Sequence, residues 1–219
     1  MRDLAHPEVL RNSSMAAAVS ALACYPRLHD WHARPYQLWF MEAVLFLGGI
    51  VLWAFVFGWH TKYSGAHVFT ARPDRLAFII ATLTGIVGAI TQRLWLDPIL
   101  KPRMPEDFPT NLYQWFTIVL FSLAFADLFV VFAPFDWLLR LSRSKAWSTG
   151  LTIVFGLFVL WLKQRTLAQR LPPEFFASLL FSRAVGAALS VYFYLRGGVL
   201  LVWWCHLLVH SRHLWHLSA

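Results

Sequence analysis

Long apolar stretches separated by short polar connections dominate the pattern along the chain. Each stretch approaches the length that an α-helix needs to cross about 30 Å of hydrocarbon. Spanning helices are therefore predicted over Tyr36–Trp59, Leu76–Leu96, Leu112–Pro134, Lys145–Leu162, Phe175–Leu195 and Gly198–Leu217. The connections 97–111 and 163–174 are polar and contain prolines, which end helices. The pattern thus predicts an all-α fold, a polytopic transmembrane bundle of about six spanning helices.

The first 35 residues differ from the rest of the chain. Their apolar stretch, MAAAVSALAC at 15–24, is too short to span a bilayer and has polar residues on both sides. Such a stretch is typical of a helix that lies in the membrane interface. We therefore divide the chain into an N-terminal amphipathic or interfacial segment, 1–35, and a transmembrane helical domain, 36–219.

Composition agrees with a membrane protein. Hydrophobic residues make up 58% of the 219 residues, charged residues only 14%, and the mean hydropathy is +0.55. A soluble domain usually has roughly a quarter charged residues. The 12 Trp and 19 Phe suit lipid-facing surfaces with interfacial aromatic belts. The net charge of +8 suits anionic lipid headgroups. Because Lys and Arg occur singly between apolar runs, no nucleic-acid partner is predicted.

The distribution of basic residues sets the expected orientation. Lys and Arg are somewhat more frequent in the connections on the side that holds both termini. Basic connections remain on the cytoplasmic side of a membrane, so we predict that both termini are cytoplasmic. The expected location is a bacterial inner membrane, with the lipid bilayer and other membrane proteins as partners.

Ionisable side chains inside the predicted spans are the main functional candidates, because each is costly in hydrocarbon. Asp127 lies within LAFADLFVVFAPFDWLLRL, and Arg183 lies about two turns into the fifth predicted span. His206 and His210 are four residues apart, so one helix face presents both imidazoles. We predict that all four side chains face one cavity between the third and last spans. There, Asp127 would pair with Arg183 or with a histidine.

The histidine spacing also raises the possibility of a metal or haem site. Zinc-binding HExxH helices place two histidines at this spacing, but no Glu follows His206 and no third ligand is evident. Bis-histidine haem ligation needs a facing histidine, and the nearest candidate, His60, lies at a helix end. Cys24 and Cys205 cannot form a CxxC metal site or a disulfide framework. We predict no metal and no cofactor, and keep a pigment- or haem-binding subunit as a third hypothesis.

Two segments have their polar and turn residues in a recognisable order. They are FADLFVVFAPFDWLLRLSRSKAWSTGLTIVFGLFVLWL and VYFYLRGGVLLVWWCHLLVH. This order resembles the CPBP family, the CAAX-prenyl-protease and bacteriocin-processing intramembrane proteases, also called the Abi family. The family pattern is a Glu-Glu-x-x-x-Arg helix, a Phe-x-x-x-His helix and a final His-x-x-x-Asn/Asp helix. The resemblance covers residues of about 120–212 and implies a helical membrane fold with an intramembrane peptidase site.

The first two motifs are degenerate in this register. Ala126 and Asp127 stand at the Glu-Glu pair, and Val131 stands at the motif arginine. Phe155 retains the Phe of the second motif, whereas Val159 occupies the place of its histidine. Two of the polar groups that the family uses are therefore replaced by valine.

The last motif is better retained. His206 matches its histidine, and His210 stands where the family has Asn or Asp. The resemblance implies chemistry in which a Glu deprotonates water, histidines position that water, and a His/Asn pair stabilises the oxyanion. Because Asp127 is one methylene shorter than Glu and the second-motif histidine is missing, we predict a pseudoprotease, which binds or scaffolds within a membrane complex. The alternative is an active endopeptidase that uses Asp127, His206 and His210.

Overall fold

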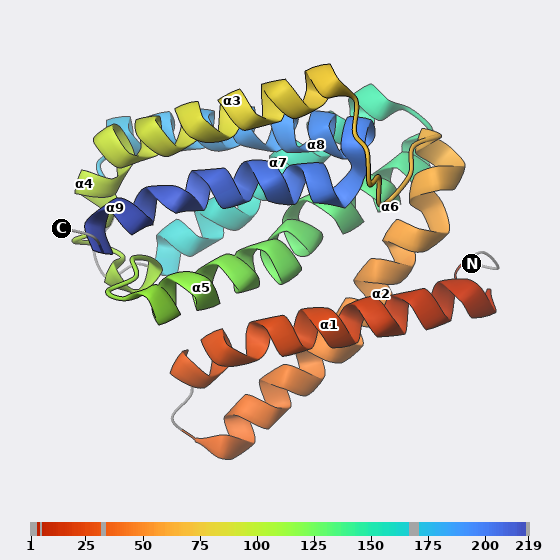
Figure 1. Cartoon of the computed structure of the whole chain (residues 1–219), viewed down its shortest axis with the longest axis horizontal. Helices are drawn as coiled ribbons and strands as arrows, with labels where there is room; N and C mark the ends of the chain where they lie inside the picture. Colours follow the sequence, from red (N-terminus) through yellow and green to blue (C-terminus); the bar gives the residue numbers. More distant parts are fainter. Residues whose placement is uncertain (1–3, 5, 32–33, 167–170, 218–219) are drawn as a thin grey trace.

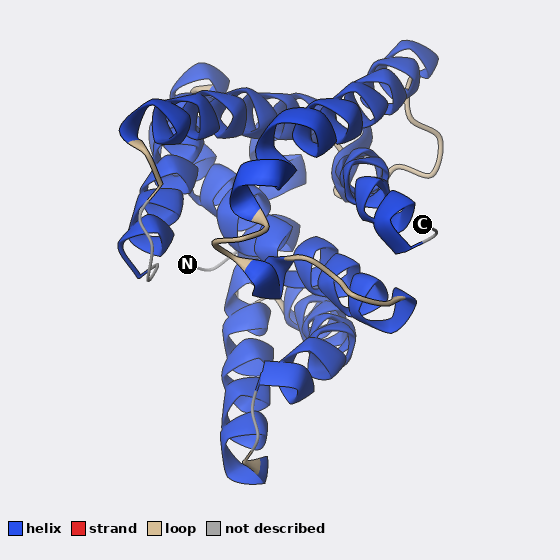
Figure 2. Ribbon diagram, turned by 90° about the vertical axis from the view of Figure 1, so that its left-hand side faces the viewer, coloured by secondary structure: helices blue, strands red, loops and turns tan. Residues whose placement is uncertain are grey.

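The computed structural model describes residues 4, 6–31, 34–166 and 171–217. Within these residues every named element is a helix, which confirms the predicted all-α fold (Figure 2). In Figure 1 the first two helices, α1 and α2, lie along one another, and the remaining helices pack into a bundle beside them. The elements are α1 (Pro7–Trp31), α2 (Pro35–Ser64), α3 (Arg75–Thr91), η1 (Gln92–Leu96), α4 (Asp97–Leu100), η2 (Pro105–Asp107), α5 (Leu112–Phe121), η3 (Ser122–Ala126), η4 (Leu128–Phe132), α6 (Ala133–Ser142), α7 (Lys145–Thr166), α8 (Pro173–His210), η5 (Ser211–His213) and α9 (Leu214–Leu217).

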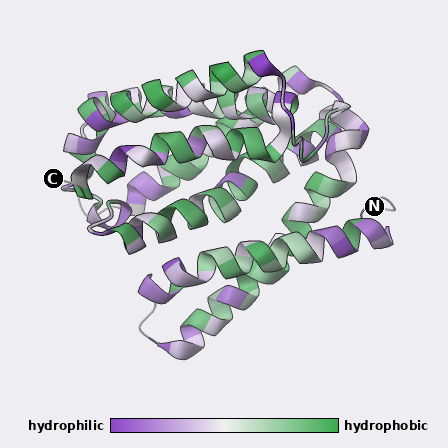
Figure 3. Ribbon diagram, viewed as in Figure 1, coloured by the Kyte–Doolittle hydropathy of each residue, from purple (hydrophilic) through white to green (hydrophobic). Residues whose placement is uncertain are grey.

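Five helical segments in the described residues are long and apolar enough to cross a membrane: Pro35–Ser64, Arg75–Leu100, Leu112–Ser142, Lys145–Arg165 and Pro173–His213. Hydrophobic residues follow these segments in Figure 3. The protein is therefore an integral, multi-pass membrane protein with membrane-embedded helices. The fifth and sixth predicted spans fall within a single segment, because the turn between them is only one residue wide.

That turn is at Gly198, where the backbone of α8 leaves the helical conformation with φ 68° and ψ −164°. Ser190 and His206 are 16 residues apart, which is about 24 Å in a straight helix, yet Ser190 Oγ lies 3.0 Å from His206 Nε2. Helix α8 therefore folds back into two antiparallel arms, a first arm at 173–197 and a second arm at 199–210 (Figure 1). Only glycine suits the turn, because a Cβ on Gly198 would approach the Val68 carbonyl oxygen to 2.3 Å.

The N-terminal helix α1 packs lengthwise on α2 and is not among the segments suited to cross a membrane. Trp53 Nε1 of α2 donates a hydrogen bond to Ser20 Oγ of α1 at 3.1 Å. The opposite side of α1 exposes Met15, Val19 and Leu22. The predicted placement of α1 in the membrane interface stays a prediction. The boundary at residue 35 stays a prediction.

The main core lies where α2, α6 and both arms of α8 meet. It contains large, fully buried side chains such as Phe132, Phe135, Tyr194 and Val202. Between helices in lipid, close packing and hydrogen bonds stabilise the bundle, because lipid tails are as apolar as these side chains. The core therefore fixes the relative position of the third span and the α8 arms, which hold the ionisable candidates.

Candidate functional site

Asp127 and His206 form the centre of the candidate site. The Nδ1 atom of His206 lies 2.8 Å from each carboxylate oxygen of Asp127, so its N–H donates to the carboxylate. Asp127 is contributed by the third span and His206 by the second arm of α8. The Asp127 side chain is 8% exposed, whereas the His206 side chain is 25% exposed. The carboxylate is thus shielded by protein, and part of the imidazole remains accessible.

The opposite side of the His206 ring contacts Ser190 on the first arm. Ser190 Oγ lies 3.0 Å from His206 Nε2, and the Ser190 hydroxyl donates to the Gly186 carbonyl oxygen at 2.8 Å. Since the one hydroxyl hydrogen is directed to Gly186, Ser190 Oγ is left to accept an N–H from His206. Both ring nitrogens then carry hydrogen, and the geometry favours an imidazolium that faces the Asp127 carboxylate.

His210 lies one turn further along and contacts Ser122, with 3.0 Å between His210 Nε2 and Ser122 Oγ. Ser122 and Asp127 are five residues apart, which would place them about 140° apart around an α-helix. The π-helical segment η3 between them closes i→i+5 turns and brings both onto one face. The π turn therefore matches the four-residue spacing of the two histidines. Sequence periodicity does not reveal such a local widening.

Arg183 lies on the first arm and is exposed. Its charge acts on Asp127, yet among the described residues no hydrogen bond or ion pair joins the two side chains. Asp127 is thus satisfied by the histidine, one of the two partners expected from the sequence. The structure brings Asp127 and His206 into contact, with His210 one turn away.

The remaining family-derived positions are apolar contacts. Val131 is buried in the main core, and Val159 on α7 is half-buried. The ring of Phe155 packs edge-on against Phe129 of the third span, with 5.7 Å between ring centroids. None of the three brings a hydrogen-bonding side-chain atom to the Asp127–His206 pair.

A second Asp–His pair, which sequence reasoning missed, lies deep in the core. His60 Nδ1 lies 2.8 Å from Asp136 Oδ1, and the Tyr194 hydroxyl donates to Asp136 Oδ2 at 2.6 Å. The His60 and Asp136 side chains are both 0% exposed. Asp136 and His60 lie near span ends in the sequence, where polar residues are ordinary. The positions of Asp136 and His60 in the sequence therefore do not indicate that the two side chains pair.

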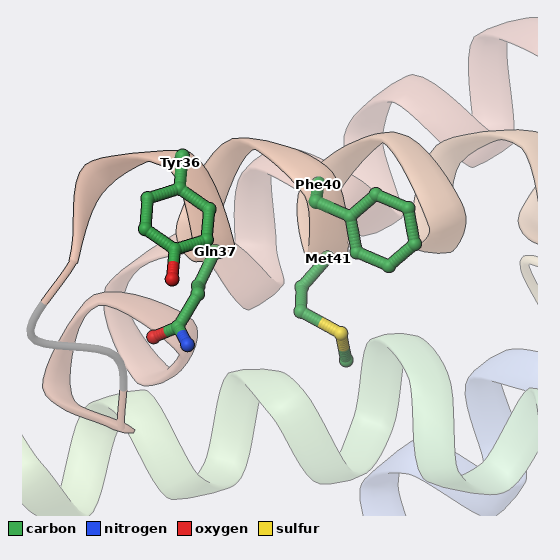
Figure 4. A pocket seen from close by; sticks show the side chains of 4 residues that line it. All are labelled: Tyr36, Gln37, Phe40 and Met41. Atoms are coloured by element: carbon green, nitrogen blue, oxygen red, sulfur yellow. The ribbon is translucent and has the colours of Figure 1, made fainter.

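Two hollows on the surface lie apart from these residues. One of about 250 Å³ is lined by Tyr36, Gln37, Phe40 and Met41, all at the start of α2 (Figure 4). The other, of about 400 Å³, is lined by residues of α1 and α2 together with Phe69, Ala124 and Trp203. Neither has Asp127, Arg183, His206 or His210 in its lining. A common cavity for these four side chains stays a prediction.

The donor set gives little scope for metal or haem ligation. Among the described residues no group of three or more His, Cys, Asp or Glu side chains is arranged to hold a metal ion. Both ring nitrogens of His206 have hydrogen-bond partners, and His60 is directed to Asp136. Coordination by either histidine would require these bonds to break. The third hypothesis, a pigment- or haem-binding subunit, stays a prediction.

Comparison with known protein families, curated proteins and solved structures finds no match to this chain. The fold and the site together define a multi-pass α-helical membrane protein. Its third span and its last helical hairpin hold a partly accessible Asp–His–Ser cluster. The resemblance to CPBP proteases is carried forward as a proposal.

Proposed function

We propose that this protein is a non-catalytic relative of the CPBP intramembrane proteases. In this proposal it acts as a binding or scaffold subunit of a complex with other membrane proteins. The cluster of Asp127, His206 and Ser190 holds the helices in register and offers a polar contact to a hydrophobic partner. The proposed setting is a bacterial inner membrane with both termini in the cytoplasm.

One observation carries the proposal: the Asp127 carboxylate is shielded by protein and paired with His206. Both carboxylate oxygens lie 2.8 Å from His206 Nδ1, and the side chain is 8% exposed. A general base must reach the water that it deprotonates, within about 3 Å. The position of the second-motif histidine is Val159, which provides no group to orient that water. These contacts support retention of the cluster for structure and binding.

The order of the hydrogen bonds within the same cluster is one observation in favour of the alternative, an active intramembrane hydrolase. Ser190, His206 and Asp127 are linked in the order of a nucleophile, a base and its orienting carboxylate. Ser190 is however 3% exposed, and its hydroxyl donates to the Gly186 carbonyl. A nucleophile in that state has neither access to a substrate nor a hydrogen directed at the base. This geometry therefore disfavours the hydrolase.

Peptide cleavage in reconstituted vesicles tests the proposal. The purified chain would be incubated with prenylated peptides and with membrane-spanning peptides, and products would be followed by mass spectrometry. We expect equal background signals for the parent protein and for Asp127→Asn, His206→Ala and Ser190→Ala. Matched controls are Asp30→Asn, an exposed carboxylate on α1, and Ser178→Ala, a half-buried serine that donates to the Glu174 carbonyl oxygen as Ser190 does to that of Gly186.

Cleavage that disappears in Asp127→Asn and His206→Ala, but persists in both controls, would establish the hydrolase instead. Loss in Ser190→Ala as well would assign a serine nucleophile, and retention in Ser190→Ala would assign a water nucleophile. The amide of Asp127→Asn keeps the size of the side chain and one acceptor oxygen. A purely structural cluster therefore tolerates this change, whereas a catalytic base does not.

A further inference from the structure

Arg183, Gly186 and Ser190 form one stripe along the first arm of α8. Residues seven apart lie within about 20° of each other around an α-helix, and Gly186 falls between them on the same side. Ser190 contacts His206 on the antiparallel second arm. The stripe therefore faces the histidine-bearing side of the second arm, and Arg183 lies about two turns from the His206–Ser190 contact.

The carboxylates whose charges act on Arg183 already have partners. They are Asp127, which accepts from His206, and Asp107, which accepts from Lys163. In the described part of the chain, no hydrogen bond or ion pair reaches the Arg183 guanidinium. Its five N–H donors and its positive charge consequently lack a protein partner. An unpaired cation within a membrane-spanning segment requires an anion or water.

Other basic side chains lie within range of the charge of Arg183. The charge of Arg183 acts on Arg212, His206 and His210, all on the C-terminal side of the hairpin. The Nδ1 atom of His210 is buried and has no hydrogen-bond partner. Arg212 is paired with Asp97, and His206 with Asp127. Among these side chains Arg183 is therefore the cation left over, and its missing ligand should be an anion with several acceptor oxygens.

There is room for such a ligand beside Gly186. A Cβ placed on Gly186 would meet no atom within 4 Å, and the residue is exposed. The neighbouring His206 side chain is 25% exposed. Ser182, four residues before Gly186 and therefore on the same side of the helix, is half-buried. Open space next to a cation in a membrane-spanning segment, with a small, partly exposed side chain beside it, suits a charged headgroup that carries hydrocarbon chains.

The depth of the guanidinium also suits a lipid phosphate. Arg183 is ten residues after Pro173, about 15 Å along the helix, and helical side chains incline towards the helix N-terminus. The Arg183 side chain therefore extends back towards the membrane surface, where the loop residue Asp107 is close enough to act on its charge. A phospholipid phosphate meets an arginine at this depth through snorkelling of the side chain and local thinning of the bilayer.

We propose that Arg183 and the open side of Gly186 form a binding site for the phosphate of an anionic phospholipid. This inference rests on the proposed function in one respect, because the neighbouring cluster of Asp127, His206 and Ser190 does not hydrolyse the bound lipid. The partner class is thus a negatively charged lipid with two acyl chains.

Native mass spectrometry of the full chain in mild detergent tests this site. The ligands are dioleoyl-phosphatidylglycerol and dioleoyl-phosphatidylcholine, offered in equal amounts. The parent protein should bind the first phosphatidylglycerol molecule more tightly than phosphatidylcholine. Arg183→Gln should weaken phosphatidylglycerol binding by about tenfold or more, because charge-assisted hydrogen bonds are lost, and Arg183→Lys should recover part of it. Gly186→Leu should weaken binding by filling the open space.

Two matched variants control for indirect effects of the substitutions on lipid binding. Arg196→Gln removes an exposed arginine at the other end of the same arm, and Gly150→Leu fills open space on α7. Both should bind phosphatidylglycerol as the parent does. Equal phosphatidylglycerol binding by the parent, Arg183→Gln and Gly186→Leu would overturn the proposal. Displacement of the lipid by millimolar inorganic phosphate, or by a peptide with a free C-terminal carboxylate, would also overturn it in favour of that ligand.

The same spectra separate failure of this inference from failure of the proposed function. A bound lipid of unchanged mass that discriminates by charge supports the site. Conversion of the lipid or of an added peptide to a smaller product would refute the non-catalytic proposal, while Arg183-dependent binding would stand. Loss of charge discrimination refutes the lipid site and leaves the cleavage assay unaffected.

Discussion

The third span contributes two aspartates, and each binds the Nδ1 atom of a histidine at 2.8 Å. Around Asp136 and His60 both side chains are 0% exposed, whereas the Asp127 and His206 side chains are 8% and 25% exposed. Because both pairs consist of an aspartate and a histidine, their roles differ through how accessible each pair is to a ligand. A pair without access can only hold helices together, and a pair with access can also meet a ligand.

The surroundings of the two pairs enlarge this difference. Asp136 has a third partner in the Tyr194 hydroxyl, and the rings of Phe132 and Phe135 pack against Tyr194. The Asp127–His206 pair instead adjoins open space at Gly186 and the charge of Arg183. We call the first the sealed pair and the second the open pair. Stability should depend more on the sealed pair, and ligand binding on the open pair.

The largest expected effect is from Asp136→Ala. Removing one member of a buried, hydrogen-bonded pair leaves His60 and Tyr194 without an acceptor, and such changes cost about 3–5 kcal/mol. The free energy of unfolding in mixed detergent micelles should fall by that amount. Asp127→Ala should cost less, about 1–3 kcal/mol, because its partner is partly accessible. Equal losses for the two variants would remove the distinction between sealed and open pairs.

Gly198→Ala should affect the open pair more than the sealed pair. The positive φ alone costs about 1–3 kcal/mol in a residue other than glycine, and the Val68 carbonyl obstructs the new methyl group. His206 depends on the return of the second arm, whereas His60 and Asp136 lie outside α8. We therefore expect loss of stability with a changed His206 ring NMR signal and a retained His60 signal. Gly186→Ala, which meets open space, is the tolerated control.

Tyr194→Phe should destabilise by about 1–3 kcal/mol, because Asp136 Oδ2 would be buried without a donor. The matched control is Tyr192→Phe, a half-buried tyrosine on the same arm, for which we expect a change within about 0.5 kcal/mol. Thermal unfolding followed by circular dichroism compares the two. A neutral Tyr194→Phe would mean that the hydroxyl does not support the sealed pair.

The smallest expected effect is the coupling energy within the open pair. A double-mutant cycle of Asp127→Asn and His206→Ala should give about 0.6–1.7 kcal/mol, the range found for hydrogen bonds between membrane helices. The same cycle with Asp136→Asn and His60→Ala should give a larger value. A coupling in the open pair above that of the sealed pair would reverse their assigned roles.

Most of the fold could be predicted from apolar run length, because a helix is the way that a single segment satisfies its backbone in lipid. The π turn at η3 and the one-residue turn at Gly198 could not, because both are local backbone changes without a periodic signal. The sealed pair was missed for a different reason. Asp136 and His60 look like ordinary interfacial residues, and only long-range packing of α2 against α6 brings them together.

Candidate residues within the predicted spans were easier to nominate. Asp127, Arg183, His206 and His210 stand out because isolated ionisable groups are rare within apolar runs. Which of them would pair was not determined by sequence, since either Arg183 or a histidine could satisfy Asp127. The choice follows from the antiparallel hairpin, which places His206 between Asp127 and Ser190.

The central claim is that one Asp–His pair is accessible and the other is sealed. Solid-state NMR of the ¹⁵N-labelled histidine rings, in lipid bilayers transferred to deuterated buffer, measures this directly. We predict that the ring N–H signals of His206 exchange soon after transfer and that the Nδ1–H signal of His60 persists, with His60→Ala and His206→Ala used to assign them. Persistence of both signals, or faster exchange at His60 than at His206, would contradict the claim.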